Sequence, residues 1–416
     1  GKSFKITSNS WEGTGDGHAL ALKAGSALVD MEFVQFHPTG MVWPPSVRGI
    51  LVTESVRGDG GVLTNSEGKR FMFNYIPDVF KDKYADNEAE ADRWYKDQNN
   101  NRRPPELLPR DEVARAINAE VKAGRGSEHG GVYLDVSKRL PADEIKRRLP
   151  SMWHQFKELA DVDITEQPME VGPTCHYVMG GVKVDPDTAA AYGVEGLFAA
   201  GEVAGGMHGS NRLGGNSLSD LLVFGRRAGA GAADYVKKLG GKAPEASDKA
   251  IAKAHDHLNA PFTREGNENP YSLHQELQNV TQDLVGIIRT EKELVDALKK
   301  LESIRERAGK VKATGGKAFN PGFHLAIDLE NMLLVSESIA RSALERQESR
   351  GGHTRDDYPK MDPNWRQVNH LTTWNGKKVD VEAQPAKMLP DELLELFEMD
   401  ELKKYFTEKE LAKGGK

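Results

Sequence analysis

Cysteine is almost absent from this chain of 416 residues, which contains Cys175 alone. One thiol cannot form a disulfide within the chain, and it cannot hold an iron–sulfur cluster, because such clusters need several cysteine ligands. The C-x-x-C-H pattern that attaches haem is missing as well. We interpret Cys175 as a small buried residue. Any iron–sulfur cluster that works with this chain is therefore expected on another polypeptide.

Long apolar runs and single-sign charge blocks are also missing. No run of 18 apolar residues occurs, so no transmembrane helix is predicted, and the first residues (GKSFKITSNSWEG) lack the apolar core of a signal peptide. The 56 Lys and Arg residues are interspersed with 63 Asp and Glu residues. This pattern indicates no basic face, and we expect no nucleic-acid partner. The length has room for two to four domains.

Apolar periodicity and turn residues predict a mixture of helices and strands. The glycine-rich turn GTGDG (13–17) leads into a helix, Pro109-Arg110-Asp111 opens another, and Thr290 with Glu293 fits a capping box. Strands are expected over 31–38, 130–137, 180–185 and 196–205 and as a pair within 365–374, and further helices over 140–159 with a break at Pro150, over 218–239 and over 325–344. Residues 69–109 form a polar excursion, either a partner contact or a solvated loop.

Histidine, arginine and a Thr-Glu pair are concentrated beside glycine-rich turns. The segments concerned are QFHPTG (35–40), LVTESVRGDGG (51–61), PTCHYVMGG (173–181) and LFAAGEVAGGMHGSNRLGGNSLSD (197–220). Glycine-rich turns at helix starts expose backbone N–H groups, which favour anions. This combination suits a small dianionic substrate held against a flat cofactor.

Six segments in a fixed order carry a family resemblance. They are QFHPTG (35–40), LVTESVRGDGG (51–61), PRDEVARAI (109–117), PTCHYVMGG (173–181), GEVAGGMHGSNRLGGNSL (201–218) and ESRGGHTRDDYP (348–359). Together they resemble the flavoprotein subunit of succinate dehydrogenase and fumarate reductase, from about residue 10 to about residue 358.

The resemblance implies an α/β fold with four domains. The expected parts are a partial, discontinuous FAD-binding domain over 1–31 and 173–240, an inserted α+β capping domain over 32–172, a helical bundle domain over 241–350 and a small C-terminal domain over 351–416. The family's flavoprotein also has a G-x-G-x-x-G turn for the FAD pyrophosphate and a histidine bonded to the flavin, and this chain contains neither. We therefore expect FAD, attached covalently through a histidine that is not in this chain.

The reaction that the resemblance implies is the oxidation of succinate to fumarate, or its reverse, by hydride transfer to FAD. The substrate-binding residues would be His37, Thr53, His176 and Arg212, since arginine grips a carboxylate with two N–H groups. The proton would be taken by Arg110, with Arg115 as a rival position. Because an arginine has a pKa above 12, it needs a fast relay, which maps onto Glu54 and Arg57.

The implied flavin contacts lie in the glycine-rich segments. They are Asp16, Glu202, Ser217 and Leu218. A carboxylate suits a ribityl or ribose hydroxyl, and N–H groups at a helix start stabilise negative charge on a reduced flavin. No residues are assigned to a metal.

The resemblance also implies partners and a location. Electrons would pass to an iron–sulfur subunit, then on to quinone, with membrane-anchor subunits contacted indirectly, on the cytoplasmic face of the cell membrane as a peripheral part of a complex. Three alternatives stay open at this point: an L-aspartate oxidase-like flavoenzyme, a stand-alone fumarate reductase, and a cofactor-free interaction protein. The absence of a haem motif speaks against the second.

Overall fold

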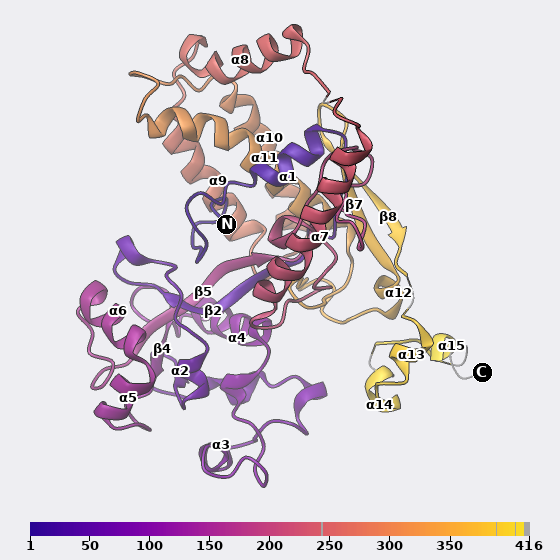
Figure 1. Cartoon of the computed structure of the whole chain (residues 1–416). Helices are drawn as coiled ribbons and strands as arrows, with labels where there is room; N and C mark the ends of the chain where they lie inside the picture. Colours follow the sequence, from indigo (N-terminus) through magenta and orange to yellow (C-terminus); the bar gives the residue numbers. More distant parts are fainter. Residues whose placement is uncertain (243, 388, 404, 412–416) are drawn as a thin grey trace. The chain divides into compact units, whose positions relative to one another are not determined.

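A computed structural model describes residues 1–242, 244–387, 389–403 and 405–411 (Figure 1). Internal contacts divide the chain into two compact units. The first unit comprises Gly1, Ile6–Ser10 and Gln35–Tyr177, and the second comprises Lys2–Lys5, Trp11–Val34 and Val178–Lys416. The four domain ranges expected from the sequence stay predictions.

The first unit is built on a four-stranded sheet with the order β2-β5-β4-β3. Its strands are β2 (Val34–Met41), β3 (Val62–Thr64), β4 (Val132–Asp135) and β5 (Met169–Val178). Strand β4 runs antiparallel to both of its neighbours, with Leu134 opposite Leu63 on one side and opposite Met169 on the other. All eight residues of β2 are buried, including the polar residues Gln35, His37 and Thr39, which alternate along the strand and therefore share one face.

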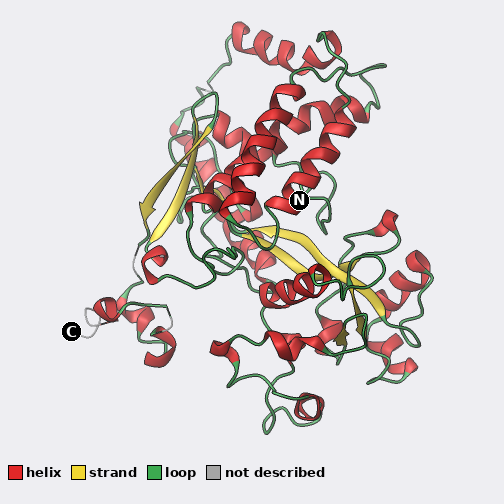
Figure 2. Ribbon diagram, turned by 180° about the vertical axis from the view of Figure 1, so that it is seen from behind, coloured by secondary structure: helices red, strands yellow, loops and turns green. Residues whose placement is uncertain are grey.

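Short helices surround this sheet and enclose one apolar core (Figure 2). They are α2 (Ser55–Gly58), α3 (Glu88–Trp94), α4 (Arg110–Lys122), α5 (Ala142–Arg148) and α6 (Pro150–Ala160), with 3-10 turns η1 (Pro45–Val47), η2 (Phe71–Tyr75), η3 (Asp78–Phe80) and η4 (Pro105–Leu107). Helix α4 buries Val113, Ala116 and Ile117, at the spacing of one helical face. The packing of this face on the core holds the first residue of the helix, Arg110, in place.

The second unit contains a four-stranded sheet with the order β6-β1-β7-β8. Its strands are β1 (Leu28–Val29), β6 (Gly181–Val182), β7 (Val368–Trp374) and β8 (Val379–Pro385). Strand β1 is antiparallel to both β6 and β7, and β7 and β8 form an antiparallel hairpin. Residues from the beginning, the middle and the end of the chain therefore meet in this sheet.

The helices of the second unit include three long ones that pack on one another. They are α9 (Pro270–Leu284), α10 (Glu291–Ala308) and α11 (Pro321–Glu345), beside α1 (Asp16–Lys23), α7 (Asn216–Lys238), α8 (Asp248–Thr263), η5 (Gly201–Val203) and the short α12 (Pro363–Arg366), α13 (Asp391–Leu394), α14 (Met399–Leu402) and α15 (Glu408–Leu411). Asn269, Thr290 and Asn320 cap α9, α10 and α11 through hydrogen bonds to backbone N–H groups. The capping role expected of Thr290 is confirmed.

Two of the expected strands differ from the structure. Among the described residues, 196–205 contain no strand of their own: Gly201 has φ 75°, which interrupts an extended segment, and η5 begins there. Within 365–374 there is one strand, β7, and its partner β8 lies further along the chain. The strand expected over 130–137 and the helix break at Pro150 are confirmed.

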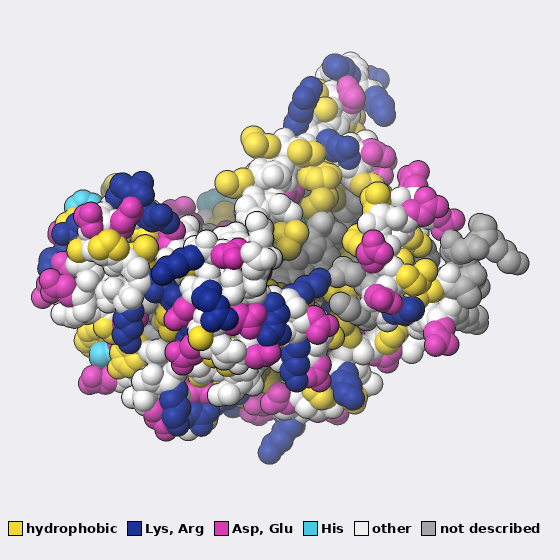
Figure 3. Space-filling model, turned by 90° about the horizontal axis from the view of Figure 1, so that it is seen from below, with side chains coloured by type: hydrophobic (Ala, Val, Ile, Leu, Met, Phe, Trp, Pro, Cys, Tyr) yellow, Lys and Arg dark blue, Asp and Glu magenta, His cyan; other side chains and the backbone are white. Residues whose placement is uncertain are grey.

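Two further observations concern the distribution of charge on the surface and the apolar composition of the helices. On the face drawn in Figure 3, Lys and Arg side chains alternate with Asp and Glu side chains without forming a large area of one sign. Within the described part of the chain, no helix combines the length and the apolar composition that crossing a membrane requires.

Candidate active site

The two histidines predicted to bind substrate lie close together on the sheet of the first unit. His37 lies on β2 and His176 on β5, and their ring centroids are 5.3 Å apart at an interplanar angle of 63°. His37 is buried, whereas His176 is partly exposed. Neighbouring strands thus present two imidazoles at one place, as a clamp for a small anion requires.

Each of these rings is oriented by a neighbour. The Nδ1 atom of His37 lies 3.0 Å from the Thr39 carbonyl oxygen and 3.3 Å from the Thr39 amide nitrogen. Since the carbonyl contact is shorter and a carbonyl can only accept, we assign the proton to Nδ1. The Nδ1 atom of His176 lies 2.8 Å from the Ser8 hydroxyl. Sequence reasoning missed Ser8, which sits in a polar segment without any motif.

The predicted relay residues are in contact with one another. The Glu54 carboxylate accepts from Nε and Nη2 of Arg110, both at 2.9 Å, and its Oε2 atom lies 3.9 Å from Nη2 of Arg57. Thr53, the residue before Glu54, donates from its hydroxyl to the Ser55 hydroxyl at 3.4 Å. One carboxylate therefore bridges two arginines that are 53 residues apart in the sequence, which is a stronger arrangement than an isolated helical ion pair.

Burial makes Arg57 unusual among these residues. Its side chain is 1% exposed, whereas that of Glu54 is 48% exposed. The Nη1 atom donates to the Glu106 carbonyl oxygen at 2.5 Å, while Nε and Nη2 have no hydrogen-bond partner among the described residues. A buried guanidinium with two nitrogens that lack acceptors costs free energy, which makes Arg57 a candidate functional residue.

Burial and the charges of the site lower three pKa values. Burial, with the positive charges of Arg57 and Arg110, holds the pKa of His37 well below its usual value. Burial lowers the pKa of Arg57 to about 10. Burial would raise the pKa of Glu54, but the two arginines outweigh it and lower that pKa. At neutral pH the site thus holds a neutral His37 and an ionised Glu54.

Arg212, the remaining predicted substrate ligand, belongs to the second unit. It is buried, and its Nη1 atom lies 3.3 Å from the Leu213 carbonyl oxygen and 3.4 Å from the Ser217 hydroxyl. The structure therefore brings Arg212 to the first turn of α7, beside two of the predicted flavin contacts.

The predicted flavin contacts come from three adjacent segments of the second unit. Asp16 opens α1 and accepts from the Asn331 side chain at 2.8 Å, and Glu202, on η5, accepts from the Val178 amide at 3.1 Å. A Cβ added at Gly17 would lie 2.7 Å from Val203, and one added at Gly201 would lie 2.6 Å from Leu221. These close approaches place the start of α1, η5 and the first turns of α7 together.

The start of α7 suits an electron-rich, flat ligand. The helix has 23 residues, and no side chain in the described part of the chain caps its first turn, where Ser217 and Leu218 lie. Its N-cap residue Gly215 has φ 82°, and a Cβ added there would meet no protein atom within 4 Å. The backbone is therefore open to close approach, and its N–H groups and the helix dipole favour negative charge. These features fit the edge of a flavin.

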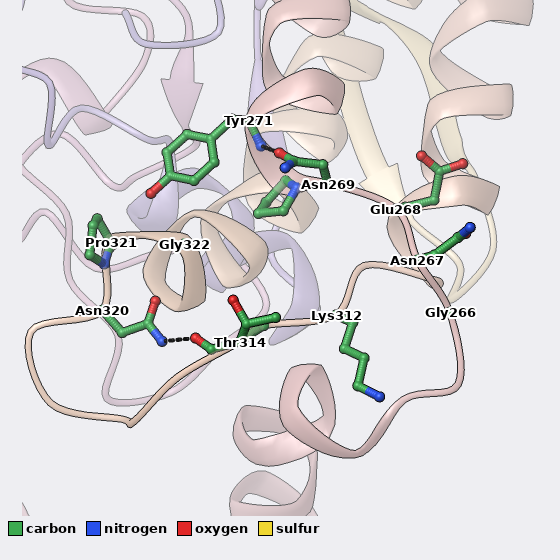
Figure 4. A pocket seen from close by; sticks show the side chains of 12 residues that line it. Gly266, Asn267, Glu268, Asn269, Tyr271, Lys312, Thr314, Asn320, Pro321 and Gly322 are labelled. Carbon is green, nitrogen blue, oxygen red and sulfur yellow. Dashed lines mark hydrogen bonds between the residues drawn. The ribbon is translucent and has the colours of Figure 1, made fainter.

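A cavity of about 450 Å³ elsewhere in the second unit contains none of the predicted residues (Figure 4). It lies where the loops before α9 and α11 approach each other. Its asparagines form hydrogen bonds with other residues that line the cavity: Asn269 accepts from the Tyr271 amide at 2.8 Å, and Asn320 donates to the Thr314 carbonyl at 2.8 Å. The Glu268 carboxylate is bound by Arg307. We assign no chemistry to this cavity.

The chain matches known families and known proteins in sequence. A family model described as an FAD binding domain matches residues 2–218, more than half of the chain, and one described as the fumarate reductase flavoprotein C-term matches residues 274–395. One chain of the fumarate reductase (CoM/CoB) of Methanothermobacter marburgensis is 43% identical over 368 residues, covering 88% of this chain and 61% of that protein.

Solved structures agree with these matches. Mycobacterium smegmatis Sdh1, solved in complex with UQ1, is 61% identical, with a TM-score of 0.83 over 99% of this chain and 65% of that one. The flavoprotein of Escherichia coli quinol fumarate reductase is 32% identical, with a TM-score of 0.81 over 94% of this chain and 65% of that one. Fold and site thus define an FAD-binding α/β flavoprotein with additional domains.

The chain belongs to the family of succinate dehydrogenase and fumarate reductase flavoprotein subunits. It spans a little over three fifths of the length of the relatives described above. The resemblance that the six sequence segments carry is therefore confirmed, and so is the α/β fold class.

Proposed function

We propose that the protein interconverts succinate and fumarate with FAD as its cofactor. The observation that carries the proposal is the position of the Glu54 carboxylate, 2.9 Å from Arg110 and 3.9 Å from Arg57. A row of ionisable groups with a partly exposed carboxylate at its centre gives a proton a route to water. A purely structural ion pair would need only one of the two arginines.

The substrate would be held by its two carboxylates. We assign this task to His37, Thr53, His176 and Arg212, of which Arg212 offers a planar pair of N–H groups. The orientation of the His176 ring by Ser8 supports such a role, because a fixed imidazole presents its other nitrogen in a defined direction. Holding both ends of a four-carbon chain also fixes the two central carbons for reaction.

Proton and hydride leave from these two carbons. The proton moves to Arg110 while Arg110 gives its own proton to Glu54, and the electron pair of that C–H bond forms the C=C bond. When bound, FAD supplies the acceptor for the hydride of the neighbouring carbon. Arg57 gives up one of its own protons toward solvent as it accepts the proton of Glu54, so that both guanidinium groups and the carboxylate return to their starting charges. The reverse order of proton transfers would deliver a proton during reduction of fumarate.

The residues assigned to FAD are Asp16, Glu202, Ser217 and Leu218. The uncapped start of α7 supports placing the electron-rich edge of the flavin there. We further propose that the attachment is covalent, through a histidine that is not in this chain.

Electron transfer would involve other polypeptides. We propose that a cluster-bearing partner supplies the iron–sulfur centres, and the presence of Cys175 alone in this chain supports that proposal. The similarity to Sdh1, solved with UQ1, and to a quinol fumarate reductase supports quinone as the final electron carrier. We propose that the protein is a peripheral component of a complex on the cytoplasmic face of the cell membrane, joined to membrane-anchor subunits through that partner.

The test is a parallel assay of the native holoprotein. Succinate with an artificial electron acceptor, fumarate with a reduced dye, and L-aspartate with the same acceptor are compared at equal concentrations. We expect turnover of succinate and fumarate and none of aspartate. Turnover of aspartate alone would assign the protein to an oxidase of amino acids, and a preparation without flavin absorbance would contradict the cofactor.

A further inference from the structure

Arg57 is held from two directions by the polar excursion at residues 69–109. Its Nη1 atom donates to the carbonyl oxygen of Glu106, on η4, at 2.5 Å. Its own carbonyl oxygen accepts from the Tyr95 hydroxyl at 3.0 Å. The excursion thus contacts both the side chain and the backbone of a residue that the sequence places in a different segment.

Glu106 is itself fixed by a buried fork. Its carboxylate is fully buried and accepts from Arg70 through two parallel hydrogen bonds, of 2.6 Å from Nε and 2.8 Å from Nη2. Paired bonds of this kind define both distance and direction. They therefore hold the whole η4 turn, together with the carbonyl oxygen that Arg57 uses.

The fork also engages both oxygens of the Glu106 carboxylate. If its carboxylate were unpaired, it would compete with Glu54 for the guanidinium of Arg57. Arg70 binds that carboxylate, and Asp92 in turn accepts from Arg70 at 2.9 Å. Arg57 consequently keeps Nε and Nη2 clear of hydrogen bonds within the described residues, with Glu54 as the carboxylate closest to Nη2.

We propose that Glu106 and Tyr95 are positioning residues that hold Arg57 in line with Glu54 and Arg110. This inference rests on the function proposed above. It gives the excursion a task inside the first unit: its charges form a clamp for the far end of the proton relay. Glu106 sets the place of the guanidinium, and Tyr95 sets the place of the backbone that carries it.

The first test compares Glu106→Gln with Glu90→Gln in the native holoprotein. Glu90 lies in the same excursion and forms an equivalent fork with Arg102, with both bonds at 2.9 Å, but has no hydrogen bond to Arg57. For Glu106→Gln we expect kcat to fall by about 10- to 100-fold with KM unchanged, as a misplaced relay residue would cause. The alkaline limb of the pH–rate profile should move to lower pH, because a negative charge near Arg57 is lost.

Glu90→Gln should leave kcat, KM and the alkaline limb at their wild-type values. If Glu106→Gln matches Glu90→Gln in all three, the inference is wrong. Should Glu106→Gln fail to fold, Tyr95→Phe removes only a hydroxyl, and we expect from it a several-fold lower kcat with an unmoved alkaline limb. Wild-type kinetics in Tyr95→Phe would then overturn the proposal.

A structural readout separates this inference from the proposed function. In a crystal structure of Glu106→Gln, Nη1 of Arg57 should leave the carbonyl oxygen of residue 106, whereas in Glu90→Gln it should stay. If the wild type turns over neither succinate nor fumarate, the proposed function fails, and these structures still decide whether the clamp exists. If the wild type is active and Arg57 does not move, only the clamp is refuted.

Discussion

Two charged clusters of this protein are built around arginine. They differ in how many nitrogens of the buried guanidinium donate a hydrogen bond to an acceptor, which we call the degree of matching. In the second unit, all three guanidinium nitrogens of Arg346 are bonded: to Glu32, to Glu348, and to backbone carbonyl oxygens. Glu32 also binds His370 at 3.0 Å. We call Glu32, Arg346, Glu348 and His370 the closed cluster.

The relay cluster of Glu54, Arg57 and Arg110 in the first unit is only partly matched. One nitrogen of Arg57 is bonded, and Glu54 is half-exposed. In the closed cluster every nitrogen of Arg346 has an acceptor, although Oε2 of Glu32 has no hydrogen-bond partner among the described residues. Buried ions whose donors are bonded stabilise a fold, whereas donors without acceptors beside an exposed carboxylate can exchange protons. The comparison leads to a hypothesis: how many nitrogens of a buried arginine are hydrogen-bonded, more than the burial itself, separates structural charges from chemical ones.

The largest effect should come from Arg110→Gln in the relay cluster. We expect kcat for succinate to fall by about 1,000-fold or more, because the proton acceptor is lost. The melting temperature should hardly change, since the lost partner Glu54 is half-exposed. Steady-state kinetics and thermal denaturation of the holoprotein measure both quantities.

Arg115→Gln is the matched control for this prediction. Arg115 lies on the same helix, α4, and pairs with Asp111 at 3.1 Å. It should keep most of the wild-type kcat. Should Arg115→Gln prove as inactive as Arg110→Gln, the relay assignment would lose its distinction between the two arginines.

The next effect concerns stability and comes from Arg346→Met in the closed cluster. Removing Arg346 leaves Glu32 and Glu348 buried without their main counter-charge, and we expect a loss of about 3–5 kcal/mol in the free energy of unfolding. Chemical denaturation measures this value. Arg307→Met, which breaks a partly exposed fork with Glu268, should cost less than about 1 kcal/mol. Equal losses in the two variants would contradict the contrast.

Local patterns in the sequence were enough for many helices and for the pairing of Glu54 with Arg57, whereas Arg110 was assigned to them by the family resemblance. The Thr290 capping box, the apolar spacing after Arg110 and the small residues of α7 each depend on neighbours a few positions away. Glu54 and Arg57 were predicted as a pair because they share one motif. For such features the sequence signal and the physical cause lie in the same segment.

Features that depend on distant partners could not be predicted in this way. The excursion at 69–109 has a polar sequence, yet Glu106 is buried because Arg70, 36 residues earlier, matches its carboxylate. The strand expected over 196–205 is absent from the described residues because Gly201 adopts φ 75°, which its apolar neighbours do not reveal. Burial of a charge is decided by its partner, and a partner far away in the sequence leaves no local mark.

A smaller effect, with a definite sign, is expected from Asp30→Asn beside the closed cluster. Burial, with the negative charge of Glu32, raises the pKa of Asp30 to about 6 from its ordinary 3.8. The folded protein therefore binds an extra proton between these values, so this contribution to stability is complete below about pH 4 and is lost as the pH rises through 6. The loss amounts to at most about 3 kcal/mol.

Asp30→Asn should abolish that part of the pH dependence and be more stable than the wild type at pH 8. Asparagine also tolerates the left-handed backbone of position 30, where φ is 53°. Urea denaturation at pH 4, 6 and 8 measures the difference. If the free energy of unfolding changed between pH 4 and pH 8 by the same amount in the wild type and in Asp30→Asn, Asp30 would not titrate as described.

The smallest expected effect is the uptake of protons when a dicarboxylate binds, which should depend on the relay site and not on the closed cluster. In the relay site, burial and the charges of Arg57 and Arg110 keep the pKa of His37 low, and its Nδ1 proton faces the Thr39 carbonyl, so the neutral ring presents a bare nitrogen to a carboxylate. A bound dianion would raise that pKa and draw a proton onto the ring.

Dicarboxylate binding should therefore take up a fraction of a proton and tighten at most about tenfold for each unit of falling pH. Calorimetric titration with succinate in buffers of different ionisation enthalpy measures the uptake. His37→Gln should bind more weakly without buffer dependence, whereas Asp30→Asn, which alters only the surroundings of the closed cluster, should show the wild-type uptake. Proton uptake that persists in His37→Gln would move the linked group elsewhere. Uptake lost in both variants would mean that the two clusters are coupled, and the contrast between a matched, structural cluster and an unmatched, chemical one would no longer hold.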